Sequence, residues 1–201
     1  MSQASYDYAN RTGILPISWE DMHGLCRALA VAAARFEPEI VLAVGRGGNY
    51  AGTLVAHMLQ AEVYSIRLSR RVNDEVTYAT PRWIVAPPEA MAGRRVLIVD
   101  EISSSGETLT LARARADAMG AVAVRTAVLY AHSWGTEVPD YIGLVSDALI
   151  LNPWDREVIR DGQVVFHPEY VAALAQQGVV AAPSLLIQAS TFELAKGNKR
   201  A

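Results

Sequence analysis

Short apolar runs rich in β-branched residues recur along this 201-residue chain, and they constrain its fold more than any other feature. The runs over residues 40–44, 94–100 and 121–130 are close to continuous, which is typical of strands buried on both faces of a sheet. Residues 63–67 and 147–151 predict two further short strands. All of these runs are far shorter than the about 20 apolar residues that a membrane-spanning helix needs.

Amphipathic patterns separate the predicted strands. After Ser18, apolar residues recur at spacings of three and four, and Asp21 completes a capping-box pattern with Ser18. Two more helices are expected over residues 50–60 and 108–119, the second with Gly120 as its C-cap. Strands that alternate with helices predict an α/β fold, with an open, mostly parallel twisted sheet flanked by helices.

Two stretches break this alternation. Residues 69–90 are polar, contain three prolines and show little periodicity, which is typical of a lid or a binding loop. Residues 157–201 are predicted to form a mostly helical C-terminal extension. The expected organisation is therefore one core domain over residues 1–156, which includes an N-terminal helix and a flexible loop at about 69–90, followed by the extension.

The composition excludes several classes of protein. Hydrophobic residues make up 51% of the chain, which is too many for a disordered protein. The net charge of −3 argues against a protein that holds nucleic acid by its phosphates. Cys26 is the single cysteine, so no intramolecular disulfide can form, and the four histidines show no zinc-binding spacing. No signal peptide is visible at the N-terminus, so a cytoplasmic location is expected.

A glycine-rich turn, residues 45–48, follows the first continuous apolar run. It is not a dinucleotide-binding fingerprint, because Tyr50 stands where that motif needs glycine, and it lacks the lysine of a P-loop. Glycines at the start of a helix let backbone amides approach an anion, and Arg46 adds donors suited to phosphate. The alternative is a tight strand-to-helix turn with an exposed arginine.

The strongest functional signal is the segment at residues 96–108. Four apolar strand residues run into Asp100 and Glu101, and a loop rich in serine then opens a helix. The two carboxylates suit sugar hydroxyls and a hydrated Mg²⁺ ion. The hydroxyls and amides of the loop can surround a phosphomonoester at the helix N-terminus. The residues expected to bind this phosphate are Ser103, Ser104, Ser105, Gly106 and Thr108.

This segment resembles the signature of the type I phosphoribosyltransferases, in which two acids precede a loop that holds the 5-phosphate of phosphoribosyl pyrophosphate (PRPP). Residues 45–48 resemble the pyrophosphate loop of that family, and residues 69–90 resemble its flexible hood. The Asn-Pro-Trp-Asp sequence at 152–155 and the helix pattern at 17–26 are similar to those of microbial hypoxanthine/xanthine-guanine phosphoribosyltransferases.

The resemblance covers about residues 15–156, and it implies a reaction. That reaction is the PRPP-dependent transfer of phosphoribose to a nucleobase, a purine, which gives a nucleoside 5′-monophosphate and pyrophosphate, as in purine salvage. Mg²⁺ is the implied cofactor, and the implied assembly is a homodimer or homotetramer without nucleic-acid or membrane partners.

The resemblance also implies roles for individual residues. Asp100, Glu101 and Ser104 are the expected catalytic residues. Asp100, Glu101 and Asp155 are the expected metal-binding residues, although Asp155 is equally compatible with an ion pair to an arginine. The residues expected to contact pyrophosphate are Arg46, Gly47, Gly48, Arg70 and Arg71.

Three positions expected to contact the base depart from the pattern of 6-oxopurine enzymes. Ser104 replaces an aspartate near the purine N7, and Leu149 replaces an aromatic residue that stacks on the base. His132 replaces a lysine that contacts the 6-oxygen; a histidine can donate to a carbonyl or accept from an amino group. Ile150 is expected where a backbone group contacts the base edge. Two alternatives therefore stay open, namely a PRPP-binding regulator without turnover and a transferase for a non-purine or modified base.

Overall fold

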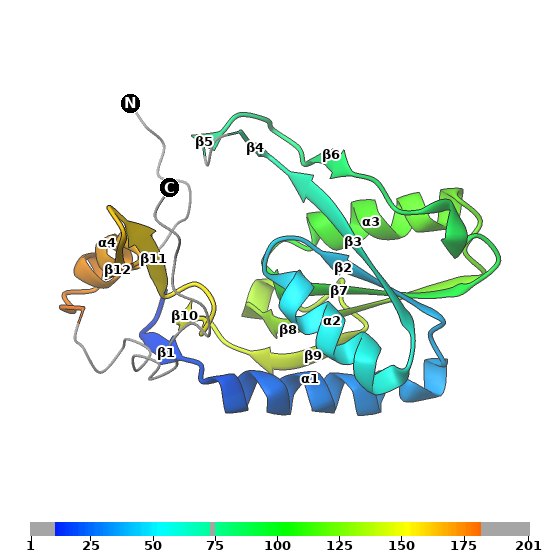
Figure 1. The fold of residues 1–201 in the computed structure, drawn as a ribbon, viewed down its shortest axis with the longest axis horizontal. Helices are drawn as coiled ribbons and strands as arrows, with labels where there is room; N and C mark the ends of the chain where they lie inside the picture. The colour runs from blue at the N-terminus through cyan, green and yellow to red at the C-terminus, as the bar shows by residue number, and fades with distance from the viewer. Residues whose placement is uncertain (1–10, 73–74, 182–201) are drawn as a thin grey trace, which may run out of the picture.

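The centre of the molecule is a six-stranded sheet with the strand order β6-β3-β2-β7-β8-β9 (Figure 1). The computed structural model describes residues 11–72 and 75–181. Neighbouring strands in the part of this order that reads β3-β2-β7-β8-β9 run parallel, and β6 pairs antiparallel with β3. The strands are β2 (Ile40–Val44), β3 (Glu62–Ser69), β6 (Arg82–Val85), β7 (Arg95–Ser103), β8 (Ala123–Ala131) and β9 (Tyr141–Val145). The predicted open, mostly parallel α/β sheet is confirmed.

Three helices cover the two faces of this sheet. They are α1 (Trp19–Ala33), α2 (Gly48–Leu59) and α3 (Glu107–Ala118). Along β2, Val41 packs in the cluster formed with α1 and α2, whereas Ile40 and Leu42 pack in the cluster that contains the apolar side chains of α3. Because successive side chains of a strand point to opposite faces, a strand covered on both sides has to be apolar throughout.

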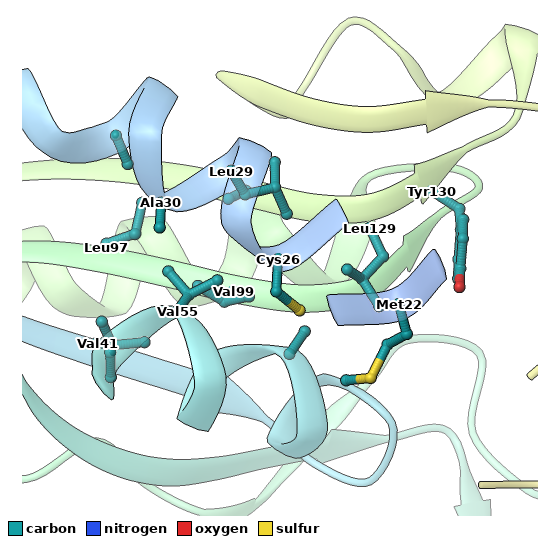
Figure 2. Packing of buried hydrophobic residues seen from close by; sticks show 14 of the residues in the cluster. Met22, Cys26, Leu29, Ala30, Val41, Val55, Leu97, Val99, Leu129 and Tyr130 are labelled. Carbon is teal, nitrogen blue, oxygen red and sulfur yellow. The ribbon is translucent and has the colours of Figure 1, made fainter. Parts of the chain in front are cut away.

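One of the two cores lies between the sheet and the helices α1 and α2. Figure 2 shows Met22, Cys26 and Leu29 of α1 gathered in one cluster with Val99 and Leu129 of the sheet. Cys26 is fully buried, and burial raises the pKa of its thiol to about 11. Cys26 is therefore a core residue.

The helix ends follow the local signals of the sequence. Ser18 and Asp21 form the predicted capping box, in which Ser18 Oγ accepts from the Asp21 amide at 3.0 Å and Asp21 Oδ2 accepts from the Ser18 amide at 2.9 Å. Helix α3 ends at Ala118 with Met119 as its C-cap, so Gly120, the expected cap, lies one position beyond the observed one. Gly120 adopts a φ of +87° there, which is the conformation that favours glycine just after a helix.

A smaller lobe stands beyond the carboxyl ends of the sheet strands (Figure 1). It contains the parallel pair of β1 (Ile14–Pro16) and β10 (Leu149–Leu151), the antiparallel pair of β11 (Glu157–Arg160) and β12 (Gln163–Phe166), and α4 (Pro168–Gln176). An apolar cluster holds the lobe together, and its buried members are Leu149, Leu151, Tyr170, Ala173 and Leu174.

Three regions differ from the sequence-based expectations. The strand predicted at 147–151 exists as β10, but it pairs with β1 and not with the central sheet. Strand β9 was not expected, because its half-exposed side chains and Gly143 give no continuous apolar run. The extension is expected to be mostly helical, whereas residues 157–166 form a hairpin and only α4 is helical among its described residues.

The 69–90 loop contains short extended segments. Strand β4 (Arg71–Val72) pairs antiparallel with β5 (Glu75–Val76), and β6 follows at the edge of the central sheet. Within residues 11–72 and 75–181, no helix combines the length and the apolar character needed to cross a bilayer.

Candidate functional site

The carboxyl ends of neighbouring parallel strands bring the predicted site residues to one edge of the sheet. The glycine-rich turn 45–48 follows β2, and His132 follows β8. The acid pair Asp100 and Glu101 lies inside β7, which extends to Ser103. In open α/β sheets, ligands bind at this edge.

The acid pair packs directly against the glycine-rich turn. A Cβ atom added to Gly47 would lie 1.4 Å from Glu101 Oε2, and one added to Gly48 would lie 2.9 Å from the Cα atom of Asp100. Any side chain at these two positions would therefore displace the acids. The turn leads into the N-terminus of α2, and the Gly45–Arg46 peptide bond is cis.

Asn152, to which the sequence analysis gave no role beyond its place in the 152–155 sequence, fixes the orientation of Glu101. Its side-chain amide donates a hydrogen bond to Glu101 Oε1 at 2.5 Å. Among the described residues, the buried Tyr130 hydroxyl and Asn152 Oδ1 have no hydrogen-bond partner. Glu101 therefore stands between the glycine-rich turn and a buried polar cluster. No local signal predicts this contact, because Asn152 and Glu101 lie 51 positions apart along the chain.

Burial shifts the titration of both acids. It raises the pKa of Asp100 to about 7. It also raises the pKa of Glu101 to about 8, and the charges of Asp100 and Asp155 add to that effect. A cation or a set of hydrogen-bond donors at this position would favour the charged forms.

The acid pair fits Mg²⁺ as part of a substrate complex. Carboxylate oxygens are the protein ligands that Mg²⁺ prefers, and Mg²⁺ is usually held by one or two of them together with water and substrate phosphates. Within the described part of the chain, no group of three or more Asp, Glu, His or Cys residues could hold a metal ion. Asp155 does not complete such a group with the acid pair, and it accepts a hydrogen bond from the Tyr170 hydroxyl at 3.2 Å.

A small cavity of about 160 Å³ lies at the start of α3. All of the residues expected to bind the phosphate line it, together with Asp100 from the acid pair and Arg70 from the 69–90 loop. The Ser103 hydroxyl donates to the Gly135 carbonyl at 2.8 Å, so it is already engaged within the protein. Gly106 precedes the helix with a φ of +72°, and a Cβ atom there would lie 2.4 Å from Val138 Cγ2. We call this cavity the cradle.

The arginines of the expected pyrophosphate site lie in different parts of the structure. Arg70 lines the cradle, and its carbonyl accepts hydrogen bonds from the Thr77 and Tyr78 amides. Arg46 lines a second, larger cavity, and its charge acts against the burial effect on Glu101. Arg71 belongs to β4, but its side chain lies outside the described part of the structure.

The second cavity, of about 840 Å³, lies between the sheet edge and the smaller lobe, and we call it the cleft. Of the four residues expected at the base, His132, Leu149 and Ile150 line it, whereas Ser104 lines the cradle. Ile102 lines both the cleft and the cradle, so the two cavities are neighbours. The cleft also has walls that the sequence did not predict, from Arg11 before β1 and from the β11 and α4 segments of the extension.

His132 is almost fully buried at the wall of the cleft. Its Nδ1 atom lies 2.8 Å from the Ser146 carbonyl oxygen. The ring stacks on Trp134, with ring centroids 4.7 Å apart and an interplanar angle of 20°. The Trp134 indole nitrogen donates to Ser104 Oγ at 3.4 Å. Burial lowers the pKa of His132, which favours the neutral ring.

The comparisons with known proteins agree on one fold. Residues 25–162 match the family model of the phosphoribosyl transferase domain. Among curated proteins, none matches the sequence.

Solved structures with the same fold share little sequence with this chain. A purine phosphoribosyltransferase from Pyrococcus horikoshii is 23% identical with a TM-score of 0.65, and the match covers 76% of this chain and 100% of that protein. A hypothetical protein from Neisseria gonorrhoeae with bound ppGpp is 22% identical with a TM-score of 0.61, over 83% of this chain and 97% of that protein. The xanthine-guanine-hypoxanthine phosphoribosyltransferase of Helicobacter pylori is 19% identical with a TM-score of 0.59, over 70% of this chain and 92% of that protein.

Proposed function

The chain belongs to the phosphoribosyl transferase domain family, and on that premise we propose that it transfers phosphoribose from PRPP to a purine base. The products are a nucleoside 5′-monophosphate and pyrophosphate. The observation that carries this proposal is the position of the acid pair. Asp100 lines the cradle and Glu101 lines the cleft, so a sugar held by both acids would join the contents of the two cavities.

The cradle would hold the 5-phosphate of PRPP. The hydroxyls of Ser105 and Thr108 and the backbone amides at the N-terminus of α3 are its donors, and Ser104 forms part of the wall. The dipole of the helix favours an anion at this end. Arg70 adds a positive charge from the 69–90 loop. Each of these groups is suited to a phosphomonoester.

The glycine-rich turn would hold the pyrophosphate. Gly47 and Gly48 bring backbone amides close to the acid pair at the start of α2, and Arg46 supplies a guanidinium group at the same place. Charge on the leaving pyrophosphate is neutralised by Mg²⁺ when the cation is bound with the substrate.

In the reaction, a ring nitrogen of the base forms a bond to the anomeric carbon of the ribose. The bond from that carbon to pyrophosphate breaks, pyrophosphate leaves with the electron pair, and the base releases its ring proton to solvent. By analogy with other glycosyl transfers, positive charge develops on the ribose ring. The ionised carboxylates of Asp100 and Glu101 would stabilise that charge, and Asn152 would keep Glu101 in place.

A purine is the proposed base. The cleft has apolar contributions from Ile102, Leu149 and Ile150, which suit a flat aromatic ring. Of the solved structures that share the fold, the one from Pyrococcus horikoshii is described as a purine phosphoribosyltransferase and the one from Helicobacter pylori as a xanthine-guanine-hypoxanthine phosphoribosyltransferase.

The test is pyrophosphate release from PRPP and Mg²⁺ with a panel of guanine, xanthine, hypoxanthine, adenine, orotate and uracil. We expect turnover with a purine. The double variant Asp100→Asn, Glu101→Gln keeps the size of both side chains and removes their charges, so turnover should fall by several orders of magnitude. A double variant with the full rate would contradict the role of the acid pair. PRPP binding without turnover on any base would instead support a regulatory protein.

A further inference from the structure

The two neighbours of His132 Nδ1 determine which ring nitrogen carries the hydrogen. Nδ1 lies 2.8 Å from the Ser146 carbonyl oxygen, and the Asp147 carboxylate is 3.9 Å away. Both neighbours only accept hydrogen bonds, so Nδ1 has to donate. In the neutral ring, Nε2 is then an acceptor with a lone pair.

This lone pair is available to a ligand in the cleft. Among the described residues, none forms a hydrogen bond with His132 Nε2. Nε2 is also not one of the side-chain atoms that are sealed from solvent without a partner. Since His132 lines the cleft, its acceptor is open to whatever the cleft holds.

Ser104 lies next to His132 and offers a hydrogen-bond donor where His132 offers an acceptor. The hydroxyl accepts a hydrogen bond from the Trp134 indole nitrogen, which leaves its own hydrogen to point elsewhere. The His132 amide donates to the Ser103 carbonyl at 3.0 Å, and Trp134 stacks on the His132 ring. A donor on Ser104 and an acceptor on His132 are therefore held side by side at the ends of β7 and β8.

We propose that Ser104 and His132 select a purine with an amino group at position 6 and reject one with an oxygen there. This inference rests on the proposed function. N9 of the purine carries the ribose, so the five-membered ring lies nearer to the cradle than the six-membered ring does. Ser104 belongs to the cradle and would donate to N7. His132 Nε2 would then face the group at position 6.

The two purine classes differ at that group. An adenine-type base presents N7 as an acceptor and the 6-amino group as a donor, whereas a guanine-type base presents acceptors at both positions. The amino group gives His132 Nε2 a hydrogen bond. An oxygen at position 6 places two lone pairs against each other and leaves both unpaired. A site built to pair with one polar group discriminates against a base that lacks it.

The first measurement is the equilibrium binding of AMP and IMP, which share the ribose 5-phosphate and differ at position 6. Isothermal titration calorimetry should give a dissociation constant about tenfold lower for AMP, the value of roughly one hydrogen bond. Equal constants, a preference for IMP, or binding of neither nucleotide would overturn the inference.

The second measurement uses the variant His132→Asn. The asparagine amide can still donate to the Ser146 carbonyl, but the variant has no atom in place of Nε2. The preference for AMP should fall to near unity, and the affinity for ribose 5-phosphate should not change, because the cradle is intact. A preference that survives in this variant, together with unchanged ribose 5-phosphate binding, would show that His132 does not select the base.

The outcomes also separate this inference from the proposed reaction. If AMP binds better than IMP but no base releases pyrophosphate from PRPP, the transferase function fails and the selection stands. If hypoxanthine or guanine is turned over and IMP binds at least as well as AMP, the transferase function stands and the selection fails.

Discussion

Burial shifts the pKa values of two side chains at the sheet edge in opposite directions. Glu101 is half-buried beside Gly47 and Asn152, and its pKa is raised by burial and by nearby carboxylates. The pKa of His132 is lowered by burial, so its ring is neutral over a wider range of pH. In both cases the uncharged form is favoured, because a low-dielectric environment penalises charge of either sign.

The lowered pKa of His132 predicts how the stability of the protein depends on pH. The unfolded chain binds a proton at this histidine near pH 6.5, before the folded protein does, so the free energy of unfolding rises with pH in this window. The contribution is fully present above about pH 6.5 and is lost as the pH falls through the folded-state pKa. The melting temperature of the wild type should therefore fall relative to that of His132→Asn, which does not titrate, between about pH 7.5 and 5. A constant difference across these pH values would contradict a lowered pKa.

At the scale of elements, the close approach of the turn 45–48 to β7 determines which substitutions its glycines tolerate. Gly47 has a φ of −62°, which alanine adopts without strain, so any effect of a substitution has to come from the contact with Glu101. Gly24 offers a matched comparison, since it lies exposed in α1 with nothing within 4 Å of an added Cβ atom.

Gly47→Ala should displace the Glu101 carboxylate and weaken PRPP binding by roughly tenfold or more, the value of one hydrogen bond to a charged group. Gly24→Ala should leave PRPP binding unchanged and raise the free energy of unfolding by about 0.5–1 kcal/mol, because alanine favours the helix. Calorimetry and urea denaturation of the two variants provide the measurements. Equal PRPP affinities in both variants would mean that Glu101 accommodates the added methyl group.

The strands that could be predicted most readily from the sequence are those that are buried on both faces. Strands β2, β7 and β8 are buried on both faces, so their side chains are apolar over most of their length. Strand β9 is a half-exposed edge strand, and the same rule does not detect it. The hairpin of β11 and β12 had a local signal, since Asp161 and Gly162 adopt φ values of +50° and +75° between two β-branched runs.

The site was predictable where it lies in one continuous segment. The acid pair and the cradle follow each other in β7 and α3, and the sequence placed them together. Asn152 was missed because only the tertiary fold brings it to Glu101. His132 was predicted to contact the base, and it lines the cleft, but the hydrogen-bonding role of its ring depends on the Ser146 carbonyl, which a sequence pattern cannot reveal.

At the scale of the whole molecule, the site is divided between two bodies. The sheet with its flanking helices supplies the cradle and the acid pair, and the smaller lobe supplies one wall of the cleft. The cluster formed by Leu149, Leu151 and Leu174 joins α4 to β10, which carries the expected base contacts. The lobe should therefore affect base binding and leave phosphate binding unchanged.

Leu174→Ala tests this division. The buried leucine should cost about 2–5 kcal/mol of stability when truncated, and the KM for the base should rise while the affinity for ribose 5-phosphate stays constant. Val171→Ala is the control on the same helix, because Val171 is 42% exposed and its truncation should change stability by no more than about 0.5 kcal/mol. A parallel loss of ribose 5-phosphate binding in Leu174→Ala would show that the two bodies do not act separately.

The pairing of β1 with β10 also has a consequence for the order in which the protein assembles during synthesis. Strand β1 leaves the ribosome early, but its partner is made only after the whole central sheet. Nearby, the Arg156 guanidinium donates to the Ile17 carbonyl, 139 positions earlier in the chain. Contacts so distant along the chain form late, since the entropy of closing the long loop has to be overcome first. A nascent chain would thus acquire the cradle before the wall of the cleft that the smaller lobe supplies.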